Sequence, residues 1–320
     1  MPTLSAESPA IYHRIHRGQQ DRSPGLLAIG SFDGVHLGHQ AIIGDLVEQA
    51  RQLNCCARVL TFYPRPAEFF APGKTLPGIM GWREKVEFIA SLGVDEVLCV
   101  PFNRRLSQLP AEKFIKDILV EQLRARRLIV GADFNFGRDR LGSVAMLQEW
   151  GPQLGFEVQV AQTVAVQGER VSSTAIRKAL VAGEMDHASR LLGRPYSLSG
   201  RVVRGAQLGR QWGIPTANLN LKGRRLCAAG VFVGNALVDS VRIPAAINIG
   251  HRPAVDSLPR PVLEAHLLDF NADLYGKRLE VELLHKIRDE VAFDSLELLR
   301  KQIETDVKTA RQWHAASLPE

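Results

Sequence analysis

The hydrophobic pattern of this 320-residue chain changes its period part-way along, and that change limits the folds open to it. Up to about residue 184, short apolar runs alternate with amphipathic segments. The run 26–29, for example, precedes apolar residues at helical spacing over 42–53. Such alternation predicts a parallel sheet with helices on both faces. After residue 195, strand-like runs follow one another with no helix between them, which predicts an antiparallel sheet or a small barrel.

These two patterns give the expected elements. In the first half we expect strands at 26–29, 58–62, 95–100, 127–130 and 156–164, and helices at 42–53, 82–92, 111–124, 143–154 and from Ser172 or Ser173 to 180. In the second half we expect strands at 196–203, 230–238, 243–249, 262–268 and 278–287, and a closing helix over 296–310. A chain of this length suits about two domains. We place them at 1–188 and 189–320.

Composition excludes several classes of protein. Apolar residues make up 45% and charged residues 23%, as in an ordinary globular chain rather than a disordered one. No stretch approaches the roughly 20 apolar residues of a membrane span, and no apolar segment of a secretory signal is visible near the N-terminus. The four cysteines form neither a disulfide framework nor a zinc pattern. We therefore expect a cytoplasmic protein without a membrane association.

Positive charge is concentrated in the second half. Residues 1–188 carry 21 basic and 20 acidic residues, whereas 189–320 carry 19 and 14. The stretch 201–225 holds six basic residues and no acidic one. A cationic patch attracts phosphorylated small molecules and nucleic acid alike, so both remain open on charge alone, as does a solvated basic loop.

A glycine- and histidine-rich run, GSFDGVHLGH, occupies 30–39, between the first expected strand and the first expected helix. Parallel sheets bind ligands at the carboxyl ends of their strands. His36 and His39 are three residues apart, so at a helix start they point the same way. Amides at a helix start and two imidazoles suit a polyphosphate. A capping turn with a solvated or metal-binding histidine pair is the alternative, and the run is neither a P-loop nor a dinucleotide fingerprint.

The His-x-Gly-His run after a first strand resembles the nucleotidyltransferase superfamily, and a second motif, VSSTAIR at 171–177, is similar to that superfamily as well. The resemblance implies a Rossmann-like domain that transfers a nucleotidyl group from ATP. It implies that His36 and His39 stabilise charge near the α-phosphate. Ser173, Thr174 and Arg177 would hold the other phosphates.

Four motifs narrow the resemblance to the bacterial bifunctional riboflavin kinase/FAD synthetase family. They are the run 30–39, TFYPRP at 61–66, GADFNFG at 131–137 and SSTAIR at 172–177. The resemblance implies that the following residues bind substrate in the adenylylation site: Gly30, Ser31, Phe32, Asp33, Gly38 and Phe62, with Asp133 and Phe136 at the flavin end. It leaves open which aspartate, if any, binds a metal there.

A second constellation begins with a glycine-rich loop that leads into Pro-Thr-Ala-Asn at 215–218. Glycines let backbone amides wrap phosphates, and Thr216 and Asn218 offer the neutral oxygens that suit Mg²⁺. This set resembles riboflavin kinase, which implies a small antiparallel barrel with a closing helix. The resemblance implies that Glu264 is the general base and that Thr216 and Asn218 bind the metal. It also implies that Gly205, Gly209, Arg210, Asn248, Arg252 and Arg288 contact the substrates.

The expected function is flavin cofactor synthesis, in which riboflavin is phosphorylated to FMN and FMN is adenylylated to FAD. ATP is the co-substrate, Mg²⁺ the metal, and no nucleic-acid partner is expected; the oligomeric state stays open. The chain departs from the family pattern at Tyr63, Arg65, Phe232 and Ala254. Three rivals remain: an enzyme with a single live activity, a nucleic-acid-binding protein, and a synthetase acting on tRNA. The last lacks a visible anticodon-binding module.

Overall fold

The computed structural model describes residues 10–12, 23–72, 77–205, 207–222, 224–252 and 260–317, and it separates into two compact units. The first unit comprises residues 1–75 and 82–171, and the second comprises 76–81 and 172–320. Residues 76–81 thus belong to the second unit although they lie between elements of the first. The domain limits of 1–188 and 189–320 stay a prediction.

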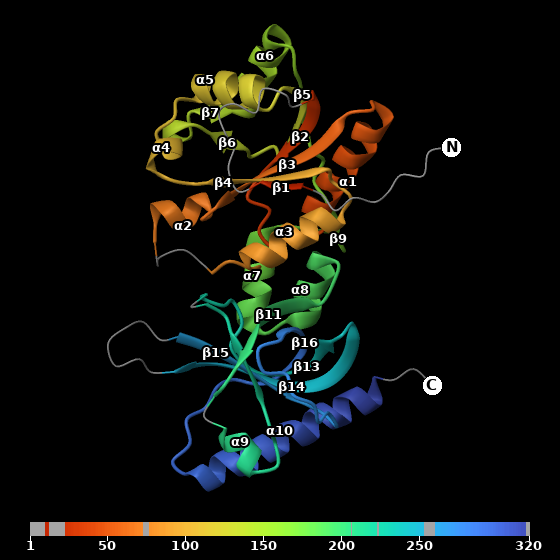
Figure 1. Ribbon diagram of the computed structural model, residues 1–320, viewed down its shortest axis with the longest axis vertical. Coiled ribbons are helices and arrows are strands. Elements are labelled where there is room, and N and C mark those ends of the chain that lie inside the picture. Colours follow the sequence, from red (N-terminus) through yellow and green to blue (C-terminus); the bar gives the residue numbers. More distant parts are fainter. Residues whose placement is uncertain are drawn as a thin grey trace. The chain divides into compact units, whose positions relative to one another are not determined.

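The first unit is built on a six-stranded parallel sheet in the order β1-β4-β3-β2-β5-β8 (Figure 1). Its strands are β1 (Ala10–Tyr12), β2 (Gly25–Ile29), β3 (Cys56–Tyr63), β4 (Glu96–Pro101), β5 (Ala125–Val130) and β8 (Glu157–Val160). All five residues of β2 are buried, which is typical of a central parallel strand covered on both faces. The predicted parallel sheet is therefore confirmed.

Helices cover this sheet, and most lie where the apolar spacing predicts them. The helices are α1 (Leu37–Gln52), α2 (Pro66–Phe70), α3 (Trp82–Ser91), α4 (Arg104–Ser107), α5 (Ala111–Lys113), the π-helical η1 (Phe114–Gln122), the 3₁₀ turn η2 (Arg138–Arg140) and α6 (Val144–Leu154). The helix expected over 111–124 begins as α5 and continues as η1. Two short hairpins complete the unit: β6 (Asn135–Phe136) with β7 (Gly142–Ser143), and β9 (Ala165–Val166) with β10 (Glu169–Arg170).

The second unit starts with two helices, α7 (Ser173–Ala182) and α8 (Met185–Leu192), and continues as a closed barrel. The barrel order is β11-β12-β15-β14-β13-β16, and every pairing is antiparallel. The strands are β11 (Tyr196–Val203), β12 (Ala217–Asn220), β13 (Gly230–Val238), β14 (Val241–Arg252), β15 (Arg260–Leu267) and β16 (Arg278–Arg288). Of the two predicted forms, sheet or barrel, the barrel is the one that forms.

Three elements of the second unit were not expected from the sequence. Strand β12 is four residues long, and α9 (Leu208–Gln211) is a single helical turn, so the expectation of no helix among these strands is wrong. Helix α8 was also missed. Helix α10 (Leu296–Ala316) closes the unit as predicted and packs on β13 and β14 (Figure 1).

The alternation along β15 explains how the barrel presents side chains to its exterior. Leu263, Ala265 and Leu267 are buried, whereas Glu264 and His266 are partly exposed between them. Successive side chains of a strand point to opposite faces. Glu264 therefore lies on the outer face of the barrel, the face on which α10 packs.

Candidate active sites

The turn that joins β2 to α1 has an unusual backbone. Phe32 and Val35 have positive φ values of 46° and 38°, and Gly34 has a φ of 83°. Non-glycine residues adopt this left-handed region only at a cost. Phe32 and Val35 are nonetheless buried, at 2% and 0% exposed. Packing thus holds the turn in one conformation at the carboxyl edge of the sheet, where ligands bind in such folds.

The two histidines of this turn are stacked on each other. Their ring centroids are 3.6 Å apart, and the planes differ by 16°. His36 caps α1: its Nδ1 accepts the backbone N–H of His39 at 3.3 Å, so a neutral His36 carries its proton on Nε2. Nδ1 of His39 is buried and has no hydrogen-bond partner among the described residues. Such an orphaned polar atom is suited to a ligand.

His39 is held in its neutral form. Burial lowers its pKa well below the usual value, and the charges of His36 and Lys85 lower it further. A neutral imidazole offers one N–H donor and one acceptor. His39 can therefore donate to a phosphate oxygen without carrying a full positive charge.

Charged residues surround the turn. Asp33, 5% exposed, accepts from Nη1 of Arg65 at 2.8 Å, and Arg65 also donates to Glu68 at 2.6 Å. Lys85 is buried on α3 and donates to the Ser31 carbonyl at 2.9 Å. No motif in the sequence marks Lys85, which lies 46 positions beyond His39 in an ordinary amphipathic helix. Arg65, one of the departures from the family pattern, is the partner of Asp33.

The other residues expected in this site lie in varied surroundings. Phe62 and Phe136 are in the hydrophobic core, and Phe136 stacks on Phe134 with centroids 5.6 Å apart. Asp133 is exposed and lies 3.7 Å from Arg170. A Cβ on Gly38 would come within 3.3 Å of the His36 ring, so glycine there lets the backbone pass close to that ring. The roles of these residues stay predictions.

The SSTAIR motif lies at the start of α7, in the second unit. Ser172 is the residue that caps the helix: its hydroxyl accepts the Ala175 N–H at 3.1 Å. Ser173 and Thr174 form the first turn, where backbone N–H groups favour anions. Arg177 follows one turn later, and its Nε donates to the Pro77 carbonyl at 3.0 Å.

The barrel brings the residues of the second constellation into one row. Glu264 of β15 is directly opposite Asn218 of β12 on one side and Asn248 of β14 on the other. Asn248 is opposite Val231, which is in turn opposite Arg288 of β16. Directly paired residues share one face of a sheet. Four polar residues separated by up to 70 positions, from 218 to 288, therefore lie side by side.

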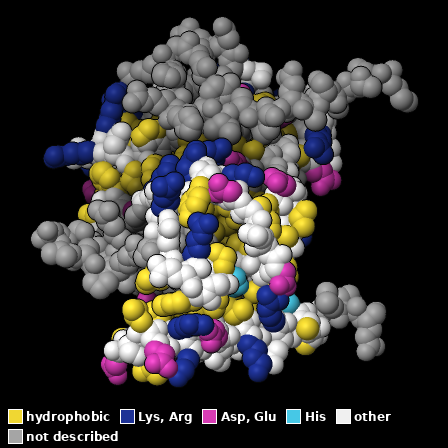
Figure 2. Space-filling view, turned by 60° about the horizontal axis from the view of Figure 1, so that its bottom comes forward, with side chains coloured by type: hydrophobic (Ala, Val, Ile, Leu, Met, Phe, Trp, Pro, Cys, Tyr) yellow, Lys and Arg dark blue, Asp and Glu magenta, His cyan; other side chains and the backbone are white. Residues whose placement is uncertain are grey.

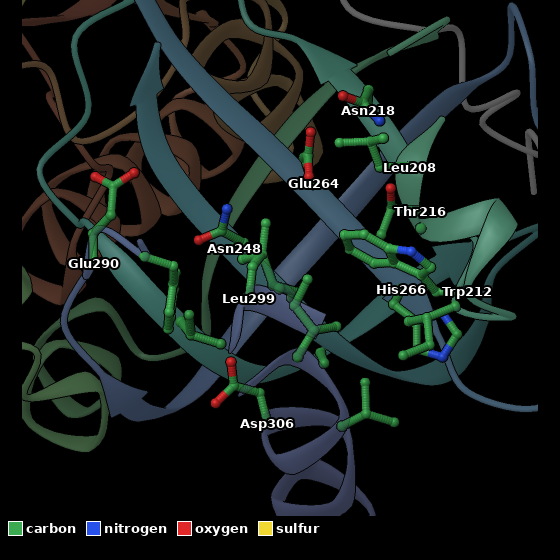
Figure 3. A pocket seen from close by; sticks show the side chains of 18 of the residues that line it. Leu208, Trp212, Thr216, Asn218, Asn248, Glu264, His266, Glu290, Leu299 and Asp306 are labelled. Carbon is green, nitrogen blue, oxygen red and sulfur yellow. The ribbon is translucent and has the colours of Figure 1, made fainter. Parts of the chain in front are cut away.

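This row forms the floor of a pocket with a volume of about 290 Å³ (Figure 3). Figure 3 shows Glu264 between Asn248 and Asn218, with Thr216 nearby. The opposite wall comes from α10, through Leu299, Ile303 and Val307. A mainly apolar pocket with a few converging polar groups is typical of a small-molecule site.

The glycine-rich loop borders the same pocket. A Cβ on Gly205 would lie 2.4 Å from Oδ1 of Asn218, so any side chain there would displace that amide. A Cβ on Gly209 would lie 2.3 Å from the Ile214 carbonyl oxygen. Gly209 lines the pocket, whereas Arg210 is exposed and is not one of the lining residues.

Three further lining residues received no role from the sequence. Trp212 follows α9, and His266 lies two positions beyond Glu264 on the same face of β15. Nδ1 of His266 is 2.8 Å from the Pro215 carbonyl, and burial lowers the pKa of this histidine. Asp306 of α10 is 4% exposed and binds Arg288 through both carboxylate oxygens, the shortest distance being 2.7 Å. For Asp306, only one feature of the sequence indicated burial, which is its position next to the apolar stripe of the closing helix.

Comparisons with known proteins agree with both constellations. The family model for FAD synthetase matches residues 18–175, and that for riboflavin kinase matches 192–314. The bifunctional riboflavin kinase/FMN adenylyltransferase of Pseudomonas fluorescens is 45% identical over 95% of this chain and 97% of its own length. This chain belongs to the bifunctional riboflavin kinase/FMN adenylyltransferase family. The member from Escherichia coli strain K12 is 43% identical over 95% of this chain and 98% of its own length.

A solved structure shares the fold of this chain. It is a chain described as a macrolide-efflux protein from Streptococcus pneumoniae, with a TM-score of 0.80 and 29% identity. The match covers 96% of this chain and all of that one. Among the residues of this chain that the structure describes, no helix has both the length and the apolar character needed to cross a bilayer.

The family resemblance drawn from the motifs is thereby confirmed, and so are the fold and the enzyme class, a riboflavin kinase and FMN adenylyltransferase. The backbone of Arg252 ends β14, four residues beyond Asn248. Ala254 lies outside the described residues. Phe232 is fully buried, and Tyr63 is 56% exposed with its ring 4.9 Å from that of Trp82.

Proposed function

We propose that this chain makes FMN and FAD at two separate sites, with the residues assigned below. The barrel pocket phosphorylates riboflavin with ATP, and the turn at 30–39 adenylylates FMN with a second ATP. The observation that carries the proposal is the row in which Glu264 lies between Asn218 and Asn248. This row combines a carboxylate that can act as a base with amide oxygens, and it lies beside a glycine-rich loop of the kind that binds phosphates.

Glu264 serves as the general base of the kinase reaction. It takes the proton from the 5′-hydroxyl of riboflavin while that oxygen forms a bond to the γ-phosphorus of ATP, and ADP leaves. The apolar side chains of α10 suit the flavin ring, and the glycine-rich loop with Gly205 and Gly209 suits the phosphates. Arg288, held by Asp306, provides a fixed positive charge in the same pocket.

Thr216 and Asn218 fit a magnesium ion. They offer one hydroxyl and one amide oxygen, two residues apart at the start of β12, and Asn218 is packed against Gly205. Mg²⁺ takes few protein oxygens and completes its shell with water and phosphate. Among the described residues no cluster of three His, Cys, Asp or Glu side chains could hold a metal instead. When bound, Mg²⁺ would neutralise charge on the phosphates of ATP.

The adenylylation site works without a covalent enzyme intermediate. A phosphate oxygen of FMN attacks the α-phosphorus of ATP, and pyrophosphate leaves. His39 donates its N–H to a phosphate oxygen as negative charge moves to the leaving group. His36 fixes the orientation of this turn by accepting the His39 backbone N–H. Ser173, Thr174 and Arg177, at the start of α7, are residue types that suit phosphate oxygens.

The cysteines and the surface charge bear on the compartment and the partners of this chain. All four cysteines are free, which suits a reducing cytoplasm, and the substrates are small molecules. On the face shown in Figure 2, several Lys and Arg side chains gather near the middle of the view, with Asp and Glu side chains beside them. Positive charge of this kind steers anionic substrates such as ATP toward the protein.

Product chromatography tests the proposal. Purified protein with riboflavin, ATP and Mg²⁺ should form FMN first and FAD afterwards. His39→Ala should stop FAD formation and leave FMN formation intact, whereas Glu264→Gln should stop FMN formation and leave the conversion of supplied FMN to FAD intact. Each variant thus controls for the other. Loss of both reactions in either folded variant would refute the division into two sites.

A further inference from the structure

A buried lysine lies directly beneath the turn at 30–39. Lys85 of α3 is 4% exposed. Its Nζ donates to the Ser31 carbonyl at 2.9 Å and to Oγ1 of Thr61 at 3.0 Å. Its ammonium also lies 4.9 Å from the centroid of the Trp82 ring. Because Ser31 lies two residues beyond the end of β2, these contacts fix the point at which the turn leaves the sheet.

Lys85 lacks the partner that a buried ammonium usually has. Among the described residues no carboxylate lies within ion-pair distance of its Nζ. The nearby carboxylates of Asp33 and Glu68 are bound by Arg65 instead. A buried charge is costly unless it is paired, and lysines are rarely buried this deeply without a partner. The fold therefore keeps a positive charge under a turn that has an orphaned histidine nitrogen above it.

We propose that Lys85 is a positioning residue of adenylyl transfer: it holds the Ser31 carbonyl and supplies the positive charge that the turn presents to the polyphosphate of ATP. This inference rests on the proposed adenylylation site at 30–39. Lys85 is too deeply buried to touch the nucleotide, so it acts through the turn and through its electric field, which is strong in a medium of low dielectric. The anion bound above it is then its counter-charge.

The charge state of Lys85 gives the proposal a measurable consequence. Burial lowers its pKa to about 8, and Asp33, Cys99 and Glu68 oppose this shift while Arg65 adds to it. His39 and the Cys99 thiol do not titrate in that range, because burial lowers the pKa of the first and raises that of the second to about 12. Bound polyphosphate favours the ammonium form. The affinity for ATP is therefore full below pH 8 and falls as the pH rises above it.

The test measures FAD formation from FMN at varied ATP concentration from about pH 6.5 to 9.5. The ratio kcat/KM for ATP reports the free enzyme, and kcat reports the enzyme with substrates bound. In the wild-type chain, kcat/KM should fall about tenfold per pH unit above a pKa near 8. The fall in kcat should begin at a higher pH. This comparison needs no variant.

Substitutions then assign the effect to Lys85. Lys85→Arg keeps the charge at every pH in the range, so the fall near pH 8 should disappear. Lys85→Met should reduce kcat/KM for ATP at pH 7 by at least about tenfold and should also abolish the fall. Lys116→Met is the matched control, because Lys116 likewise lies over a tryptophan, at 5.6 Å from the Trp150 ring, but on the surface. It should match the wild type.

The outcomes separate the two proposals. If the wild-type chain forms no FAD, the proposed adenylylation function fails. If it forms FAD but shows no fall in kcat/KM near pH 8, or if Lys85→Arg keeps that fall unchanged, the role of Lys85 is refuted. Thermal unfolding of each variant shows whether it folds. If a Lys85 variant does not fold, the pH profile of kcat/KM in the wild-type chain still tests the role of Lys85.

Discussion

Replacing Asp306 by alanine should unfold the kinase unit at a lower temperature, and the structure gives the size of the effect. The carboxylate is 4% exposed. It accepts from Nε and Nη2 of Arg288 at 2.7–3.1 Å and from Gln302 at 2.9 Å. Without it, the guanidinium group of Arg288 remains in the pocket with its main partner removed. The pair also links α10 to β16, so its loss weakens the contact of the closing helix with the barrel.

The magnitude follows from the burial of the two partners. Removing one member of a buried ion pair typically costs about 3–5 kcal/mol. The side chain of Arg288 is 21% exposed, so water can solvate part of the abandoned charge, and we take the lower end, about 3 kcal/mol. For a domain of this size, about 1 kcal/mol lowers the Tm by about 2–4 °C. The unfolding transition of the second unit should therefore drop by about 6–12 °C.

Differential scanning calorimetry of the full chain measures this change. Riboflavin shifts the transition of the unit that binds it and so identifies the kinase unit. Asp269→Asn is the matched control, because Asp269 binds Arg311 of the same helix at 2.8 Å but is 77% exposed, and asparagine tolerates the positive φ of 55° at this position. Exposed pairs contribute little to stability, so its transition should stay near that of the wild type. Equal shifts in the two variants would refute the argument from burial.

Two further predictions concern glycines. Gly205→Ala should lower kcat/KM for riboflavin phosphorylation by at least about tenfold, because a Cβ would lie 2.4 Å from Oδ1 of Asn218 and displace it. FAD formation from supplied FMN should not change, and steady-state kinetics with each substrate checks both statements. Gly44→Ala should stabilise the first unit by about 0.5–1 kcal/mol, since Gly44 is within α1 and a Cβ there meets no atom within 4 Å. Calorimetry should show a higher Tm; an unchanged or lower Tm would contradict this.

Most of the fold could be predicted because its pattern is local. The parallel strands are continuous apolar runs, and Gly93, Gly155 and Gly183 mark helix ends with positive φ values. What was missed lacks such a pattern. Strand β12 is only four residues long, and its partners are β11 and β15, so nothing nearby in the sequence indicates its pairing. The π-helical geometry of η1 depends on backbone hydrogen bonds that side-chain periodicity does not encode.

The site residues that belong to recognisable motifs could be predicted from the sequence. The site residues that matter because they are buried could not. Asn218, Asn248 and Glu264 stand in recognisable motifs, and the barrel register places them in one row. Asp306 and Lys85 stand in ordinary amphipathic helices, where a charged residue usually faces water. Their importance comes from being buried, which depends on how each helix packs. A charged residue at a position of the apolar stripe, as Asp306 is beside Ile303 and Val307, is the signal that could have found it.

The two buried charges illustrate two ways in which a fold can hold a charge away from water. Arg288 in the barrel unit has an internal carboxylate, so its charge is balanced before any substrate binds. Lys85 in the sheet unit has carbonyl, hydroxyl and aromatic neighbours but no carboxylate among the described residues within ion-pair distance. A balanced charge positions a ligand with little dependence on pH, whereas an unbalanced one is coupled to the anion it attracts. The adenylylation reaction should therefore be the more pH-sensitive of the two above pH 8, and kinase and transferase rates measured side by side on one preparation would show the difference.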